Sequence, residues 1–111
     1  MTGPSEDKRH KLGREGEELA AAWLEKKGYK VLEKNARLQG YELDLVCKHG
    51  GRIIFVEVRT RKKGGMVPAR QSLSASKARK LAMGAMAWLG EHEMWEMSCR
   101  VDLVALAAGQ N

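Results

Sequence analysis

The run of residues 52–60 constrains the fold of this chain more than any other segment. Its interior is almost entirely β-branched or aromatic, with Ile53-Ile54-Phe55-Val56 followed by Val58. Continuous apolar character of this kind is typical of a central strand that is buried on both faces. Glu57 interrupts the run, and a buried carboxylate costs several kcal/mol of desolvation unless a partner compensates it. The segment therefore predicts a sheet covered by helices on both faces, with one buried acid that needs an explanation.

Helix and strand patterns alternate along the rest of the chain. Apolar residues at helical spacing predict a helix over residues 12–27 and a second one that begins at a cap on Ser74 or Ser76 and runs to about residue 90. The expected strands are residues 29–33, 42–47, 52–60 and 99–106, with turns at residues 35–40 and 49–51. Because a helix joins the last two strands, that pair is expected to be parallel, and the first three strands to be antiparallel.

At 111 residues the chain is long enough for one hydrophobic core, so one domain over residues 12–107 is expected. Residues 1–11 show no periodicity and are expected to form a mobile, disordered tail. No membrane span or signal peptide is expected, which predicts a soluble, cytoplasmic protein. Cys47 and Cys99 have no metal-ligand spacing, and Trp23 and Trp88 lie on helical apolar stripes; all four are expected in the core.

The net charge of +6 comes from one segment of the sequence. Between Arg59 and Lys80 there is no Asp or Glu, so the excess of basic residues lies here. A charge run is often only a solvated surface, but this one-sided distribution favours contact with a polyanion such as nucleic acid. The candidate nucleic-acid-binding residues are Arg37, Arg61, Lys62, Lys63, Arg70, Lys77, Arg79 and Lys80.

Three side chains on the second and third strands form a candidate catalytic group. Asp44 is followed after 12 intervening residues by Glu57 and then by Arg59, in a D-x12-E-x-[KR] pattern. Alternation along the strands puts Glu57 and Arg59 on one face, and puts Asp44 on the face opposite Leu43 and Leu45. Paired carboxylates with open positions suit Mg²⁺ or Mn²⁺ in phosphodiester hydrolysis. On spacing alone, an ion pair between Glu57 and Arg59 explains the same residues.

Short motifs over most of the chain also resemble a known family. The motifs are Leu12-Gly13, Gly16-Glu17, Ala20, Gly28-Tyr29, Asn35, Arg37, Gly40, Glu42-Leu43-Asp44-Leu45, Phe55-Val56-Glu57-Val58-Arg59-Thr60-Arg61, Lys77, Ala85 and Leu89. In this order they resemble the YraN family of uncharacterised bacterial proteins. That family is similar to the PD-(D/E)XK nuclease superfamily, in particular to Holliday-junction resolvases.

The resemblance implies a fold and a set of roles. It implies a restriction-endonuclease-like αβββαβ core, metal-binding carboxylates at Asp44 and Glu57, an additional acidic ligand at Glu17, and by similarity a homodimer. Two departures are visible: Arg59 stands where the superfamily has lysine, and Tyr41 where the family typically has glycine. An arginine stays protonated, so it can stabilise charge on a phosphate but cannot act as a base.

Three functions remain open at this point. The first is a metal-dependent endonuclease that binds and hydrolyses structured DNA, and the second is a noncatalytic nucleic-acid-binding module of the same fold. The third is a small interaction subunit whose basic face meets an acidic protein. The sequence specifies neither the substrate nor the oligomeric state.

Overall fold

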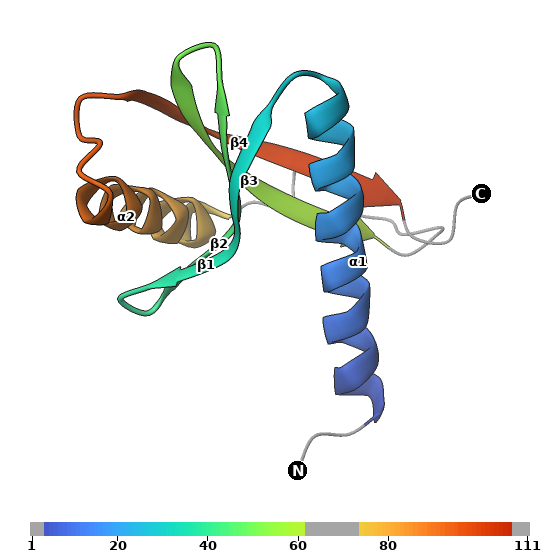
Figure 1. The fold of residues 1–111 in the computed structure, drawn as a ribbon. Helices are drawn as coiled ribbons and strands as arrows, with labels where there is room; N and C mark the ends of the chain where they lie inside the picture. Colours follow the sequence, from blue (N-terminus) through green and yellow to red (C-terminus); the bar gives the residue numbers. More distant parts are fainter. Residues whose placement is uncertain (1–3, 62–73, 108–111) are drawn as a thin grey trace.

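A four-stranded mixed sheet with a helix on each side forms the fold of this protein (Figure 1). The computed structural model describes the backbone of residues 4–61 and 74–107, and the side chains of residues 14–60 and 74–106. The elements in chain order are α1 (Pro4–Lys26), β1 (Lys30–Leu38), β2 (Tyr41–His49), β3 (Arg52–Arg61), α2 (Ala75–Glu91) and β4 (Ser98–Ala107).

The strands lie in the order β1-β2-β3-β4, and their directions agree with the sequence prediction. β1 pairs with β2 and β2 with β3 in antiparallel fashion, whereas β3 and β4 are parallel from Arg52↔Ser98 to Arg61↔Ala107. Gly50 and Gly51 have φ values of 59° and 77° and form the tight turn between β2 and β3, a conformation that favours glycine. The αβββαβ order and the mixed open sheet are those of a restriction-endonuclease-like core.

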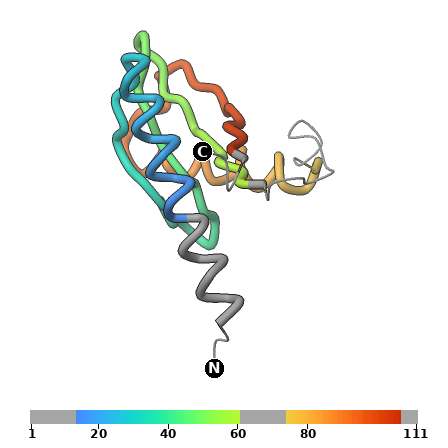
Figure 2. Tube along the Cα trace, turned by 90° about the vertical axis from the view of Figure 1, so that its right-hand side faces the viewer, coloured from blue at the N-terminus to red at the C-terminus, as the bar shows by residue number. Residues whose placement is uncertain are grey.

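Each face of the sheet is covered by one helix, as the apolar run of β3 predicted. In Figure 2, where the right-hand side of Figure 1 faces the reader, α1 crosses in front of the strands. Ala20, Ala21 and Leu24 of α1 pack against one face of the sheet, in a cluster that includes Ile54 and Val56 of β3. Residues on both faces of β3 are therefore removed from water, which accounts for the lack of polar alternation in its sequence.

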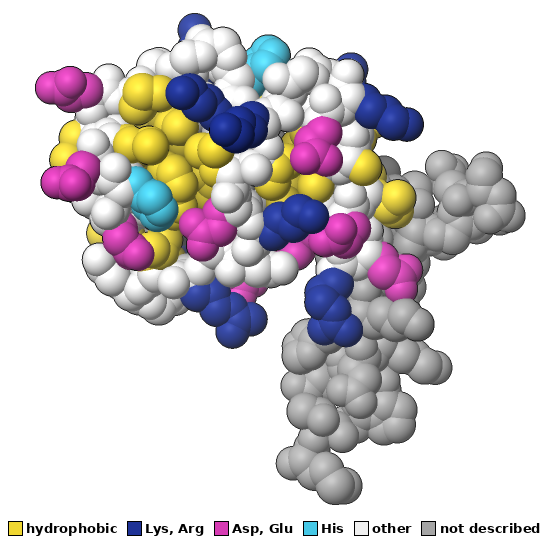
Figure 3. Space-filling view, in the orientation of Figure 1, with side chains coloured by type: hydrophobic (Ala, Val, Ile, Leu, Met, Phe, Trp, Pro, Cys, Tyr) yellow, Lys and Arg dark blue, Asp and Glu magenta, His cyan; other side chains and the backbone are white. Residues whose placement is uncertain are grey.

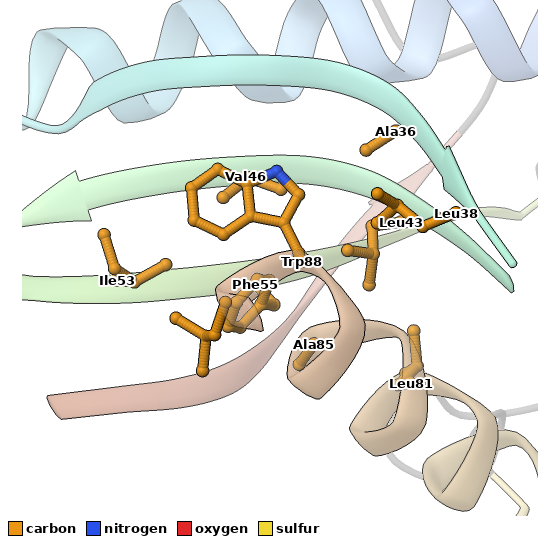
Figure 4. Close-up of a cluster of buried hydrophobic side chains, with 10 residues drawn as sticks. Ala36, Leu38, Leu43, Val46, Ile53, Phe55, Leu81, Ala85 and Trp88 are labelled. Atoms are coloured by element: carbon orange, nitrogen blue, oxygen red, sulfur yellow. The ribbon is translucent and has the colours of Figure 1, made fainter. Parts of the chain in front are cut away.

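Helix α2 covers the other face with a core centred on Trp88. Trp88 is 2% exposed and meets the ring of Phe55 edge-on, with ring centroids 5.8 Å apart (Figure 4). Its indole N–H donates a hydrogen bond of 2.9 Å to Glu33 Oε1, so the polar atom of this buried ring is satisfied. Ser74 caps α2 by accepting a hydrogen bond from the backbone N–H of Lys77. Of the two predicted caps, Ser74 and Ser76, the structure therefore has Ser74.

The first two strands differ from the prediction in extent and in alternation. Residues 35–38, expected in a turn, belong to β1, and the turn between β1 and β2 is confined to Gln39 and Gly40. Leu43 and Leu45 were expected on one face, but Leu43 packs in the cluster under α2 and Leu45 in the cluster under α1. The alternation of β2 is therefore interrupted at Asp44, which lies between them.

Three further expectations about α1 and the core need correction. The helix begins at Pro4 rather than at residue 12, while the predicted mobility of residues 1–11 stays a prediction. Cys99 is exposed, whereas Cys47 is buried as expected, because Cys99 lies on the edge strand β4. Trp23 is 50% exposed, since Ala20, Ala21 and Leu24 take up the contact with the sheet. None of the helices in the described residues has the length and apolar character needed to cross a bilayer.

Candidate metal and nucleic-acid site

The candidate site forms where strand β2 separates from strand β3. The regular pairing of the two strands runs from His49↔Arg52 to Leu45↔Val56, so Asp44 and Glu57 are the next residues on each strand. Asp44 Oδ2 accepts a hydrogen bond of 2.8 Å from the backbone N–H of Val58. The carboxylate thus takes the place of a backbone acceptor, and it holds the separating strands at a fixed spacing.

Glu57 is a buried acid with two cationic neighbours. The residue is 4% exposed, and its Oε2 lies 3.4 Å from Lys77 Nζ of α2 and 3.6 Å from Arg59 Nε of β3. These two ion pairs offset part of the desolvation cost that the sequence indicated. The expected pair with Arg59 is present, and Lys77 is a second partner that joins α2 to the site.

Glu17 reaches the same site from helix α1. Gly16 brings this part of the helix close to the sheet, because a Cβ atom there would lie 2.5 Å from Thr60 Oγ1 and 3.6 Å from Leu106 Cδ1. Glu17 Oε1 is buried, and it has no hydrogen-bond partner among the described residues. Because Gly16 has no side chain, the helix lies close to the sheet, and the carboxyl group of Glu17 reaches the site beside Asp44.

The charge of Asp44 helps to raise the pKa of both Glu17 and Glu57. Burial, followed by the charge of Asp44 and a hydrogen bond with it, raises the pKa of Glu57 to about 7, although Lys77 and Arg59 act in the opposite direction. Burial and the charge of Asp44 likewise raise the pKa of Glu17 to about 7, with a smaller contribution from Glu42 and a hydrogen bond from Asn35 that lowers it. Near neutral pH the cluster therefore retains protons that a bound cation would displace.

The donor chemistry of this cluster fits a hard divalent cation. Glu17, Asp44 and Glu57 offer only carboxylate oxygens, and Glu17 Oε1 is a buried acceptor without a partner among the described residues. Over residues 14–60 and 74–106, however, no three Asp, Glu, His or Cys side chains converge closely enough to form a complete metal site. Lys77 and Arg59 lie against Glu57 instead, so a cation would have to compete with them. The three acids supply the oxygen ligands that such a cation prefers, but they do not converge into a complete ligand set.

The described part of the predicted basic surface borders this cluster. Lys77 pairs with Glu57, and Arg37 Nε lies 3.3 Å from Glu42 Oε2, next to Glu17. Arg79 and Lys80 are exposed on the first turns of α2. The side chains of Arg61, Lys62, Lys63 and Arg70 lie outside the described residues. On the face in Figure 3, Lys and Arg side chains are interspersed with Asp and Glu, so this face is not uniformly basic.

Two contributors to the site were not recognised in the sequence. Asn35 has a φ of 52° within β1, and its side chain acts to lower the pKa of Glu17; its position in a supposed turn concealed this role. Thr60 faces Gly16, and neither residue type by itself indicates a contact between a helix and a strand. The one signal for Asn35 in the sequence is its residue type, because asparagine tolerates a left-handed backbone conformation.

Comparison with known proteins finds similarity over most of this chain. Residues 16–106 match the model of a family described as "Uncharacterised protein family UPF0102". A UPF0102 protein of Nitratidesulfovibrio vulgaris (strain DP4) is 40% identical over 100 residues, covering 90% of this chain and 75% of the relative. One of Anaeromyxobacter dehalogenans (strain 2CP-C) is 40% identical over 107 residues, covering 96% and 80%. One of Geobacter metallireducens is 37% identical over 95 residues, covering 86% and 78%. The matched region contains Glu17, Asp44, Glu57 and Arg59.

Proposed function

This chain belongs to the uncharacterised protein family UPF0102, as its resemblance to the YraN family predicted, and we propose that it is a metal-dependent nuclease that acts on structured DNA in the cytoplasm. The observation that carries the proposal is the meeting of Asp44 and Glu57 at the end of the β2–β3 pairing, with Glu17 beside them. These acids come from three elements, and raised carboxyl pKa values such as those of Glu17 and Glu57 are typical of functional sites.

Each side chain has a distinct part in this proposal. Asp44, Glu57 and Glu17 would hold Mg²⁺ or Mn²⁺, which supplies Lewis-acid activation of the phosphodiester. Arg59 stays protonated, so it would bind and stabilise negative charge on the phosphate rather than accept a proton. Lys77, at the start of α2 and beside Glu57, would contact the phosphate together with Arg59.

The basic residues around the cluster would hold the DNA backbone. Arg79 and Lys80 are exposed beside Lys77, and Arg61, Lys62, Lys63 and Arg70 belong to the same acid-free stretch of sequence. Contacts of this kind are sequence-independent and salt-dependent, with log K falling by about 0.9 per phosphate neutralised as log salt rises. Recognition of DNA structure rather than sequence agrees with such a surface.

A second candidate is a noncatalytic nucleic-acid-binding module. The observation in its favour is that Lys77 and Arg59 both pair with Glu57, so this acid is compensated without a metal ion. In that case the ion pairs would hold α2 on the sheet, and the basic surface alone would contact DNA. The two candidates differ in whether a metal ion would replace Lys77 and Arg59 as the partner of Glu57.

A cleavage screen separates the candidates. The purified chain would be incubated with single-stranded, duplex, flap and four-way-junction DNA, and with RNA, in Mg²⁺ or Mn²⁺. Cleavage by the wild type that is lost in Asp44→Asn and kept in Glu15→Gln, an exposed acid on α1, supports the nuclease. Salt-dependent binding without cleavage of any substrate supports the binding module. Binding that is insensitive to salt and to a Lys62→Glu, Lys63→Glu double change points to an acidic protein partner instead.

A further inference from the structure

Strand β4 lies at one edge of the sheet. Within the described residues it pairs only with β3, so its second row of backbone N–H and C=O groups has no strand partner. The pairing with β3 is regular over all 10 residues of β4, and the exposed edge is therefore long and uninterrupted. Such an edge is a template for pairing with another strand.

The opposite edge of the sheet carries the features that prevent strand pairing. β1 bears the charged residues Lys30, Glu33, Lys34 and Arg37, its register shifts between Val31 and Glu33, and Asn35 has a positive φ. β4 has no proline, no lysine and no bulge, and its two charged residues have opposite signs. One edge of this sheet is thus protected and the other is not.

The side chains of β4 are also covered incompletely. No described residue of this strand is fully buried, and Val101 is 40% exposed. On the side of α1, a groove of about 430 Å³ lies between the helix and the strand, lined by Trp23 and Lys27 and by residues around Asp102. Apolar surface along an unpaired strand favours association.

The charged residues of β4 indicate which strand could pair with it. Arg100 Nε donates to Asp102 Oδ1 at 3.0 Å, so the two residues lie on one face with Val101 between them. If a second β4 lies antiparallel about a two-fold axis at Val101, Arg100 of each chain faces Asp102 of the other, and Cys99 faces Leu103. Each charged residue then faces a residue of opposite charge, and Cys99 and Leu103 form an apolar pair. We propose that the open edge of β4 binds β4 of a second copy of this chain, which gives a homodimer with one continuous sheet.

A pair of charge-reversal variants tests this arrangement. Arg100→Glu places two acids opposite each other in the dimer, and Asp102→Lys places two bases opposite each other. Each variant alone is expected to sediment as a monomer of about 12.4 kDa. An equimolar mixture restores both opposite-charge pairs and is expected to sediment at twice that mass. A contact within one chain does not explain this rescue, because neither chain in the mixture has a complementary pair of its own.

Two further measurements test the proposed two-fold axis at Val101. Val101→Lys puts two like charges on the axis and is expected to give a monomer, whereas Met86→Lys, at an exposed residue of α2, is expected to leave the dimer intact. In a Cys99→Ser background, Val101→Cys is expected to form a disulfide between two chains under mild oxidation. Circular dichroism melts check that each variant is folded.

The inference fails if the wild type remains a monomer up to about 1 mM, a concentration at which even weak dimers form. It also fails if the two charge variants do not combine, or if Val101→Lys leaves a dimer. All of these readouts are masses in solution without metal or DNA, so they are independent of the proposed nuclease. An inactive dimer would refute the function alone, and an active monomer would refute the dimer alone.

Discussion

Asp44 Oδ2 accepts a hydrogen bond of 2.8 Å from the backbone N–H of Val58, across the point where β2 leaves β3. The same carboxyl group acts on Glu57 and on Glu17, whose pKa values it helps to raise. Asp44 therefore combines a structural contact with an electrostatic one. These two roles can be separated, because an amide oxygen can replace the first and cannot replace the second.

Asp44→Asn and Asp44→Ala are expected to differ in stability. Asparagine keeps an acceptor for the Val58 N–H and removes the repulsion with Glu17 and Glu57, so it should match or exceed the wild type at pH 8. Alanine leaves the N–H without its acceptor and is expected to cost about 1–2 kcal/mol. Urea unfolding measures both changes. Equal destabilisation by the two substitutions would mean that the amide oxygen of asparagine does not replace the carboxylate as acceptor for the Val58 N–H.

The stability of the wild type is expected to fall as the pH rises. The pKa values of Glu17 and Glu57 are about 7 in the folded chain, against an ordinary value of 4.5, so the folded state binds protons more tightly than the unfolded state. This contribution is fully present below pH 4.5 and is lost as the pH rises through about 7. Melting temperatures at pH 5.5 and pH 8, at one ionic strength, measure the effect.

Glu17→Gln is the matched variant for the pH experiment, since it removes one of the titrating groups. The fall in stability between pH 5.5 and pH 8 should become smaller in this variant and stay unchanged in Glu15→Gln. A wild type whose melting temperature is the same at both values would contradict the raised pKa values.

Binding of Mg²⁺ or Mn²⁺ is expected to release protons. A cation at Glu17, Asp44 and Glu57 requires ionised carboxylates, so its affinity should increase between pH 6 and pH 8. Calorimetry in two buffers of different ionisation enthalpy measures the protons released per cation. Glu17→Gln is expected to weaken binding and Asp44→Asn to abolish it. An affinity that does not depend on pH would place the cation elsewhere.

Gly16→Ala is expected to move Glu17 out of the site. Its Cβ would approach Thr60 Oγ1 to 2.5 Å, and overpacking of this kind costs about 1–3 kcal/mol. The higher helix propensity of alanine offsets at most about 1 kcal/mol of this. Because the helix must shift, the pKa of Glu17 should fall toward its ordinary value, which an NMR titration measures.

A second substitution distinguishes a steric effect from other causes. Thr60→Ala removes the clashing oxygen, so the Gly16→Ala, Thr60→Ala double variant should regain both stability and the raised pKa of Glu17. Thr60→Ala alone is the reference for this comparison. Additive losses in the double variant would show that the contact between Gly16 and Thr60 does not position the helix.

Arg59 has different expected outcomes in the two candidate functions. In a nuclease, Arg59→Lys keeps a positive charge near the phosphate and should retain substantial cleavage, whereas Arg59→Ala should lose it. In a binding module, Arg59→Ala chiefly lowers the melting temperature, because Glu57 loses one of its two ion-pair partners among the described residues. Cleavage rates and melting curves of the same preparations distinguish these cases.

The sequence determined the order of the elements and the two-sided burial of the sheet. The apolar run in β3 requires cover on both faces, and a helix between β3 and β4 requires a parallel pair, so these features follow from local pattern and chain connectivity. The buried acid at Glu57 was visible for the same reason. The part of Glu17 in the site was implied only by the resemblance to a known family.

Tertiary structure alone decided how the site is assembled and which surfaces stay open. The interruption of β2 at Asp44 contradicts simple alternation, because the strands separate there and a side chain replaces the backbone acceptor. Lys77 meets Glu57 only through the packing of α2 on the sheet. Cys99 and Trp23 fit core patterns but are exposed, because β4 is an edge strand and the small residues of α1 take up the contact with the sheet. Periodicity describes which side of an element is apolar, whereas the neighbours that cover that side are fixed by long-range packing.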